Sequence, residues 1–315
     1  MLRTQLESEI AGQSRSAPEA ADPVDAAGQV ASVELLSSPG HLLRVFQQVH
    51  TRLWAEHMTT DLTAPQFSAL AALAQEPGVD QRTVGERASL DKATMAEMVV
   101  RLVQRGLLLR RRDPADGRRK LLSLSPLGAE VLQRTTDALD AVHDAVLAPL
   151  APEERRVLVA AITAFAGLAE NGAERAESAR TLGYLIRVAQ QGHTRLWSEF
   201  VPGDLTSPQY AVLHALARES GLDQRTLGER ASLDKATMAE LIGRLVRRGV
   251  VLRRRDPADG RRNLLALSTD GLALLESVAE GVDAVQSRML DAIGGDPAAR
   301  DRALLMLRRA ARLED

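Results

Sequence analysis

The chain has 315 residues, of which 45% are hydrophobic and 26% charged, with a formal net charge of -2, which together predict about two globular domains. The absence of cysteine excludes disulfide bonds, thiolate metal sites and thiol-based redox sensing. The sequence has neither a secretory signal nor an apolar segment long enough to span a bilayer, so we expect a cytoplasmic protein.

An internal repeat dominates the organisation of the chain. Residues 1–36 are rich in Ala, Ser, Pro and acidic residues, and we predict a mobile arm with no assigned function. Beyond it, a shift of 143 residues aligns residues 40–128 with residues 183–271 without a gap. The repeat predicts two similar units, over residues 37–170 and 171–315.

Each unit shows the same order of predicted elements. Helical periodicity and capping signals predict four helices, at residues 37–57, 64–75, 80–88 and 91–105 in the first unit and 180–199, 207–219, 223–231 and 234–248 in the second. The turn-rich segment Asp-Pro-Ala-Asp-Gly, flanked by apolar residues, then predicts a two-stranded hairpin. Two closing helices follow, at residues 126–148 and 152–168 and at residues 268–292 and 297–313. The expected fold is mainly α with small β wings.

The segment at residues 80–106 has the spacing of a helix-turn-helix motif. A helix around residues 83–87 meets a tight link at residues 88–90, and a second helix starts at the N-cap Asp91 and stops at Gly106. Apolar residues recur at three and four residues along the second helix and would face the core. Its other face is left for DNA, and its first two turns are the part that reaches base edges in the major groove.

The candidate DNA-contacting residues come from this motif and from the hairpin that follows it. In the first unit they are Thr83, Lys92, Ala93, Thr94, Ala96, Glu97, Arg101, Arg118 and Arg119. In the second unit they are Thr226, Lys235, Ala236, Thr237, Ala239, Glu240, Arg244, Arg261 and Arg262. The two glutamates are awkward, because phosphate repels a carboxylate in the groove unless that carboxylate accepts from a cytosine amino group.

The distribution of charge supports the assignment. Residues 82–120 hold 11 Lys or Arg against five Asp or Glu, and residues 225–263 repeat that balance. Each module therefore carries +6 while the rest of the chain carries -14. The positive field lies where phosphates would lie, which favours double-stranded DNA as the partner.

The segment LDKATMAEMVVRLVQRGLLLRRRDPADGRRKLLSLSPLG resembles the signature of the MarR family of bacterial transcriptional regulators. The resemblance implies that an arginine of each wing, Arg118 or Arg261, enters the minor groove, and that Asp116 or Asp259 orients it. It also implies that the first and last two helices of each unit form the dimer interface. Because two units are fused here, we expect a single chain to act as a pseudo-dimer related by a pseudo-two-fold axis.

A stripe of ring-bearing residues on the first long helix of each unit is a candidate ligand wall. Its members are Phe46, His50, Trp54 and His57 in the first unit and His193, Trp197 and Phe200, with Ala189, in the second. Core packing is the alternative interpretation of such a stripe. A histidine and an arginine of the repeated HTRLW segment beside this wall would suit a flat carboxylate. The resemblance implies a ligand between this helix and the DNA-binding module, such as an aromatic acid or its thioester.

The sequence therefore predicts a sequence-specific transcriptional regulator, with repression of a palindromic operator relieved by a small ligand. The matching DNA-reading residues predict a near-perfect inverted repeat, whereas the unequal stripes predict unequal ligand affinities at the two sites. The alternative is a non-specific architectural DNA-binding protein without an effector. We expect no enzyme, cofactor or metal site, because the chain has no phosphate loop and no metal-spaced cluster among its six histidines.

Overall fold

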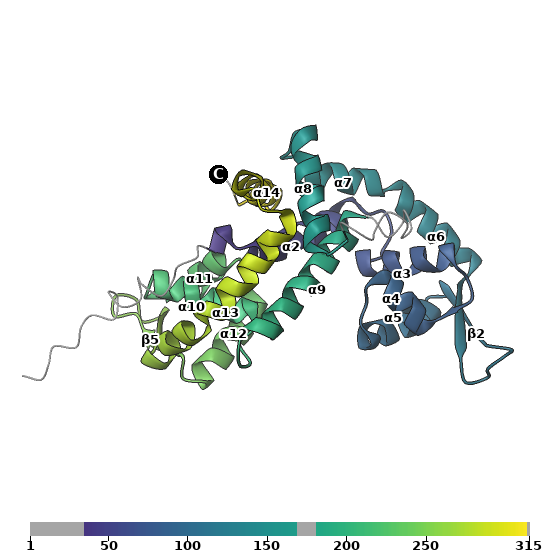
Figure 1. Cartoon of the computed structure of the whole chain (residues 1–315). Coiled ribbons are helices and arrows are strands. Elements are labelled where there is room, and N and C mark those ends of the chain that lie inside the picture. The colour runs from purple at the N-terminus through teal and green to yellow at the C-terminus, as the bar shows by residue number, and fades with distance from the viewer. Residues whose placement is uncertain (1–34, 169–180, 314–315) are drawn as a thin grey trace, which may run out of the picture.

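The computed structural model describes residues 35–168 and 181–313, and within them the two predicted units are present as two winged helix modules joined by a helical body (Figure 1). The modules lie at opposite ends of the molecule. Most of the predicted N-terminal arm and the predicted boundary at residue 170 lie outside the described residues. No helix in the described part of the chain is long and apolar enough to cross a membrane.

The elements of the two units follow one another in the same order. The first unit comprises η1 (Leu35–Ser37), α2 (Pro39–His57), α3 (Ala64–Gln75), β1 (Val79–Asp80), α4 (Gln81–Ala88), α5 (Lys92–Gln104), β2 (Leu108–Arg112), β3 (Lys120–Leu124), α6 (Pro126–Asp137), α7 (Leu139–Leu147) and α8 (Pro152–Phe165). The second comprises α9 (Leu182–Phe200), α10 (Ser207–Arg218), β4 (Leu222–Asp223), α11 (Gln224–Ala231), α12 (Lys235–Arg247), β5 (Val251–Arg255), β6 (Asn263–Leu267), α13 (Thr269–Ile293) and α14 (Pro297–Ala310).

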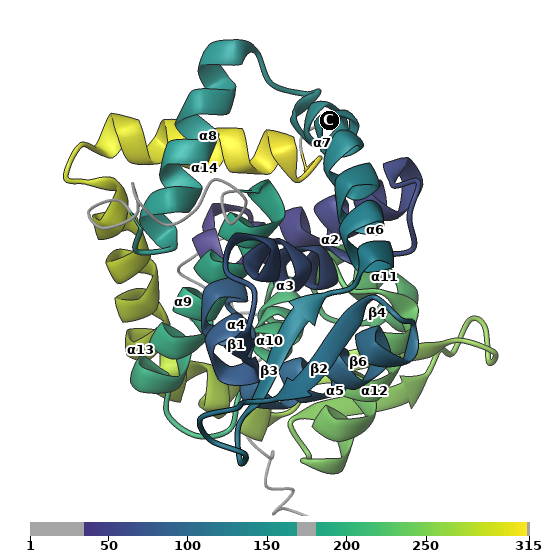
Figure 2. The same ribbon diagram turned by 90° about the vertical axis from the view of Figure 1, so that its right-hand side faces the viewer.

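Each wing is a hairpin that a third short strand extends. In the first unit β3 lies between β1 and β2, and both pairings are antiparallel, with Leu108 opposite Leu124 and Arg112 opposite Lys120 (Figure 2). Leu122 of β3 is buried, whereas most of β2 is exposed. The second unit repeats this arrangement in the order β4, β6, β5. The short first strand, which the sequence did not predict, ties the wing to the start of the helix-turn-helix motif.

The hydrophobic core has three parts. One cluster lies within each DNA-binding module, and the third is shared by the two units. The shared cluster takes its buried residues mainly from α2, α7 and α8 of the first unit and from α9 and α14 of the second. This confirms the expected fold, in which the first and last helices of the units form a dimer-like body between two winged modules.

The two units differ where the first closing helix passes the end of the long helix. Gly281 lies within α13, and a Cβ built on it would be 2.2 Å from the carbonyl oxygen of Phe200. At the equivalent position stands Ala138, and there the helix is interrupted, since α6 ends at Asp137 and α7 begins at Leu139. The prediction of one helix over residues 126–148 is therefore wrong at this point. A methyl group prevents the close approach that glycine allows.

Replacing Gly281 with alanine should lower the free energy of unfolding by about 1 to 3 kcal/mol, because the added methyl group meets the Phe200 carbonyl. Helix propensity alone predicts the opposite sign, since alanine is the better helix former by about 1 kcal/mol. Chemical denaturation gives the difference. Gly243→Ala is the matched control, because a Cβ there meets only the flexible Arg247 side chain, at 3.4 Å. Equal or greater stability of the Gly281→Ala variant would contradict this explanation.

Candidate DNA-binding surface and ligand sites

The start of the second helix of each helix-turn-helix is fixed by an aspartate. The Asp91 carboxylate accepts from the backbone N–H groups of Ala93 and Thr94, both at 2.9 Å, and from the Thr94 hydroxyl at 2.5 Å. These bonds, that from the Thr94 hydroxyl first, lower the pKa of Asp91. Asp234 makes the same bonds in the second unit. The cap holds the first turn rigidly, as base reading requires, and it also engages the Thr94 hydroxyl that sequence reasoning assigned to DNA.

The predicted DNA-facing residues of α5 lie together on one exposed face. Lys92, Ala93, Thr94, Ala96, Glu97 and Arg101 are all exposed, and their counterparts on α12 are exposed except for the half-buried Thr237. Thr83 and Thr226 are half-buried and donate backbone N–H groups to the N-cap carboxylates of α4 and α11.

The glutamates on this face are paired with arginines one turn further on. Glu97 lies 3.2 Å from Arg101, and Glu240 makes the equivalent ion pair with Arg244. The pairing offsets the negative charge locally, so the face as a whole remains compatible with the phosphate backbone.

The two adjacent arginines of each wing have different surroundings in the structure. Arg118 is exposed at the wing tip and has no ion-pair partner among residues 35–168 and 181–313. Asp116 accepts from the Arg118 backbone N–H at 3.0 Å, so the aspartate orders the turn that carries the arginine. The resemblance implied that Asp116 orients Arg118; the structure shows this backbone bond between the two residues, and the orienting role stays a prediction.

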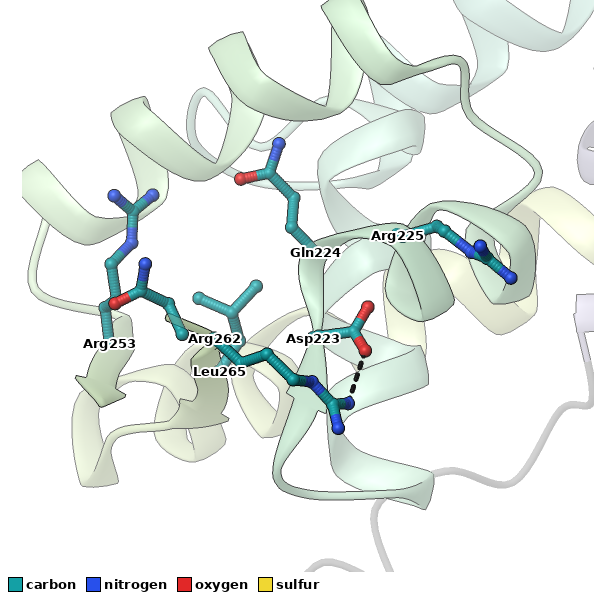
Figure 3. Close-up of a pocket in the computed structure, with 7 residues that line it drawn as sticks. Asp223, Gln224, Arg225, Arg253, Arg262 and Leu265 are labelled. Atoms are coloured by element: carbon teal, nitrogen blue, oxygen red, sulfur yellow. Dashed lines mark hydrogen bonds and ion pairs between the residues drawn. The ribbon is translucent and has the colours of Figure 1, made fainter. Parts of the chain in front are cut away.

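The neighbouring Arg119 is engaged within the protein. Its guanidinium lies 2.8 Å from Asp80 and 3.7 Å from Asp113. In the second unit Arg262 pairs with Asp223 at 2.6 Å in a recess between the wing and α11 (Figure 3). Hydrogen bonds from the Thr226 backbone and from Arg262 lower the pKa of Asp223 to about 2. Arg119 and Arg262 therefore connect the wing to the helix-turn-helix. The sequence analysis had instead predicted that they contact DNA, and that contact stays a prediction.

The long helix of each unit reaches into the helix-turn-helix of the other. From α2, Arg44 donates to the carbonyl oxygens of Ser232 at 2.6 Å and Ala231 at 2.7 Å, at the end of α11. Ser232 has a positive φ of 50° and forms the turn of the motif. Because the carbonyls at a helix C-terminus carry partial negative charge, they are suitable partners for a cation.

The reciprocal contact comes from α9. Arg187 donates to the Ala88 carbonyl at the end of α4 at 2.8 Å and to the Ser68 hydroxyl at 3.1 Å, and Gln191 donates to the Ser89 carbonyl at 2.8 Å. Burial lowers the pKa of both Arg44 and Arg187 to about 10, which leaves them charged at neutral pH. Neither has an ion-pair partner within the described ranges. Each unit thus supplies a half-buried cation without a carboxylate to the other unit.

Each of these arginines interacts electrostatically with a histidine of the opposite unit, Arg187 with His50 and Arg44 with His193, and each histidine belongs to a group of neighbouring rings. We name the two groups by their arginine. The Arg187 site contains His50, Trp54, Phe67, Ser68 and Tyr184, and the Arg44 site contains His193, Trp197, Tyr210, His214 and His41. The centroids of successive rings, from His50 through Trp54 to Phe67 and from His193 through Trp197 and Tyr210 to His214, lie 5.6 to 5.9 Å apart.

His50 and His193 are neutral at pH 7 and are tightly packed against the opposite unit. Burial lowers the pKa of His50 and of His193 to about 4. A Cβ on Gly40 would lie 2.1 Å from the His193 ring, and one on Gly183 would lie 2.5 Å from the His50 ring. Each ring therefore lies directly on the backbone of the opposite long helix, and both sites are built from the two units together.

The predicted ligand wall is only partly brought together. His50, Trp54, His193 and Trp197 lie in the two sites, each tryptophan donating its indole N–H to a backbone carbonyl. Phe46 is fully buried in the shared core and His57 is exposed at the end of α2. Phe200 packs on Arg288, with the guanidinium carbon 5.0 Å from the ring centroid.

Sequence reasoning missed the two arginines that face the rings. The arginine of the first HTRLW segment is Arg52, which is exposed and lies 4.0 Å from Glu56. A usable signal existed, because Arg44 and Arg187 each stand six residues before a site histidine in both repeats. No group of three or more His, Asp or Glu residues that could hold a metal ion occurs in the part of the chain that the structure describes.

The paired winged modules, their matched basic faces and the exposed wing arginines define a DNA-binding transcriptional regulator. Two models described as MarR family match the chain, one at residues 62–120 and one at residues 203–262. The chain is 39% identical over 119 residues to the transcriptional regulator HosA of Escherichia coli O111:H-. The matched segment covers 38% of this chain and 87% of HosA. The chain belongs to the MarR family, whose members are in general not enzymes.

Other relatives also match about the length of one unit. The transcriptional repressor NicR of Pseudomonas putida is 33% identical over 98 residues, covering 31% of this chain and 62% of NicR. The PcaV transcriptional regulator from Streptomyces coelicolor, solved in complex with its natural ligand, is 47% identical, covers 44% of this chain and 99% of PcaV, and superposes with a TM-score of 0.41. The two family-model matches show that this chain carries two MarR-type units in tandem.

Replacing Arg118 and Arg261 together with alanine should weaken operator binding by about tenfold or more, because each wing loses the free cation at its tip. The slope of log affinity against log salt should fall by about two, one for each lost phosphate or groove contact. A salt-controlled gel-shift titration measures both quantities. Arg156→Ala with Arg302→Ala, exposed arginines of the helical body, is the matched control. Unchanged affinity after the wing substitutions would contradict the wing assignment.

Proposed function

We propose that a single chain represses transcription by placing both winged modules on one operator, and that a small aromatic acid releases it. The shared core gives one chain the two-module body that a dimer would otherwise supply, so a monomeric chain is sufficient. In this arrangement α5 and α12 enter two successive major grooves, and the wings reach the flanking minor grooves. The repressor relative NicR is consistent with this sign of regulation.

The observation that carries the proposal is the position of Arg44 and Arg187. Each guanidinium binds the turn of the opposite helix-turn-helix and also interacts electrostatically with the buried histidine of that unit, His193 for Arg44 and His50 for Arg187. A carboxylate is the natural partner for a guanidinium that has only neutral acceptors, because the charged pair forms shorter and stronger hydrogen bonds. The rings of Trp54 and Trp197 provide the apolar wall that a flat acid requires.

The ligand and the turns of the two helix-turn-helix motifs then compete for the same two arginine side chains. An acid that draws Arg44 away from the Ala231 and Ser232 carbonyls frees the second module from the long helix of the first, and Arg187 does the same for the first module. The ligand favours conformations in which the modules are no longer held at the spacing of the operator. Release of DNA follows from a shift in population.

The proposal predicts that aromatic carboxylates release the chain from its operator and that the corresponding amides do not. Benzoate and hydroxybenzoates should raise the melting temperature and lower operator affinity, whereas the matching benzamides, which lack the charge, should do neither. Thermal-shift and gel-shift assays measure the two effects. Arg44→Met with Arg187→Met should abolish the response to the acids.

Arg52→Met with Arg195→Met is the matched control, because it removes equivalent exposed arginines from the same two long helices. This control should respond like the unchanged chain. The proposed ligand sites would be wrong if acids and amides changed melting temperature and operator affinity equally. They would also be wrong if the Arg44 and Arg187 variant still responded fully to the acids. Footprinting of a discrete site distinguishes this regulator from a non-specific DNA-coating protein.

A further inference from the structure

The two DNA-binding faces differ at a position that core packing does not explain. Between residues 80–100 and residues 223–243, 17 of 21 positions are identical. Three of the four differences are buried and keep an apolar residue: Val84 and Leu227, Met98 and Leu241, and Val99 and Ile242. The fourth pairs Val100 with Gly243. Sequence reasoning treated the two faces as equivalent and missed this pair.

Val100 lies in the middle of the exposed face of α5. It follows Ala93 and Glu97 by seven and three residues, which places all three on one line along the helix. Its side chain is 50% exposed, so a branched apolar group stands on a surface whose other side chains are small, polar or charged. The apolar group that DNA presents in the major groove is the 5-methyl group of thymine. Val100 is therefore suited to contact a T·A pair.

The second module offers different chemistry at the same place. Gly243 has no side chain, and the guanidinium of Arg247 lies back over it, 3.4 Å from the place of the missing Cβ. The residue equivalent to Arg247 in the first module is the uncharged Gln104. A guanidinium free to extend along the groove is the usual partner of guanine O6 and N7.

The total charge of the two modules is nevertheless equal. On the wing, the first module has Lys120 where the second module has the uncharged Asn263. On the recognition helix, the second module has Arg247 where the first module has Gln104. Both wing positions are exposed. Phosphate attraction is therefore matched between the modules, while the groups that face the bases are not.

From these differences we infer that the chain reads two unequal half-sites and binds its operator in one fixed direction. The first two turns of α5 and α12 read matching base pairs in the two half-sites. The base pair that Val100 contacts in the first half-site is T·A, and the base pair at the equivalent place beneath Gly243 is G·C. A homodimer cannot choose a direction, because its two recognition helices are identical; a fused chain can. The inference rests on DNA binding by α5 and α12.

The absence of cysteine makes the direction measurable. Ala115→Cys or Ala258→Cys, equivalent exposed positions in the two wings, gives a single attachment point for iron–EDTA in an otherwise cysteine-free chain. Each labelled chain is bound to the operator that the full chain selects from a randomised duplex pool. The Ala115→Cys chain should cut one half of the operator, and the Ala258→Cys chain the other half, with about a tenfold preference.

Exchanging the two faces should reverse the pattern. The exchange variant carries Val100→Gly, Gln104→Arg, Gly243→Val and Arg247→Gln, and its labelled forms should cut the opposite halves. Replacing thymine with uracil in the first module's half-site should weaken binding of the unchanged chain about fivefold, and the same change in the other half should not. If each labelled chain without the exchange substitutions cut both halves of the operator equally, the inferred direction would be wrong while operator binding would stand. If no discrete site were protected at all, both the inferred direction and the proposed operator binding would be wrong.

Discussion

The architecture depends on two half-buried guanidinium groups that cross the pseudo-two-fold axis. Arg44 and Arg187 are held by backbone carbonyls at the ends of α11 and α4, and neither pairs with a carboxylate in the part of the chain that the structure describes. Neutral acceptors bind a desolvated cation less strongly than a carboxylate does. Under the proposed function, the contact is firm enough to set the position of each recognition helix and weak enough for an anion to break it. The proposal thus assigns positioning of the DNA-binding modules and sensitivity to an acid to the same interaction.

Fusion of the two units removes the requirement that they stay identical. In a homodimer every substitution appears twice, whereas here Gly281 and Ala138 shape equivalent helices differently. The Arg44 site has Tyr210 and His214 where the Arg187 site has Phe67 and Ala71. The expected difference in ligand affinity between the sites stays a prediction, and these additional polar groups give it a chemical basis. The asymmetry of Val100 and Gly243 extends the same freedom to DNA reading.

The repeat, the helix-turn-helix and the wings could be predicted from the sequence, because periodicity, N-caps and turn residues are local signals. The contacts between the units could not, because Arg44 and Ser232 are 188 residues apart and meet only when the units pack. Arg52 was the more obvious candidate beside His50, yet a residue two positions away points to the other side of a helix. The break at Ala138 likewise depends on how closely the end of the preceding long helix can be approached. Asp80 and Asp223 gave no local sign that they would hold Arg119 and Arg262.

Hydrogen exchange at the two helix-turn-helix turns tests the central claim most directly, because it reports on the backbone that Arg44 and Arg187 hold. The amides of residues 88–91 and 231–234 should exchange faster when an aromatic carboxylate saturates the chain, while those of the shared core do not. An amide of the same shape should leave the turns protected. Slower or unchanged exchange at both turns with the acid bound would contradict the claim that ligand and turn compete for the same arginines.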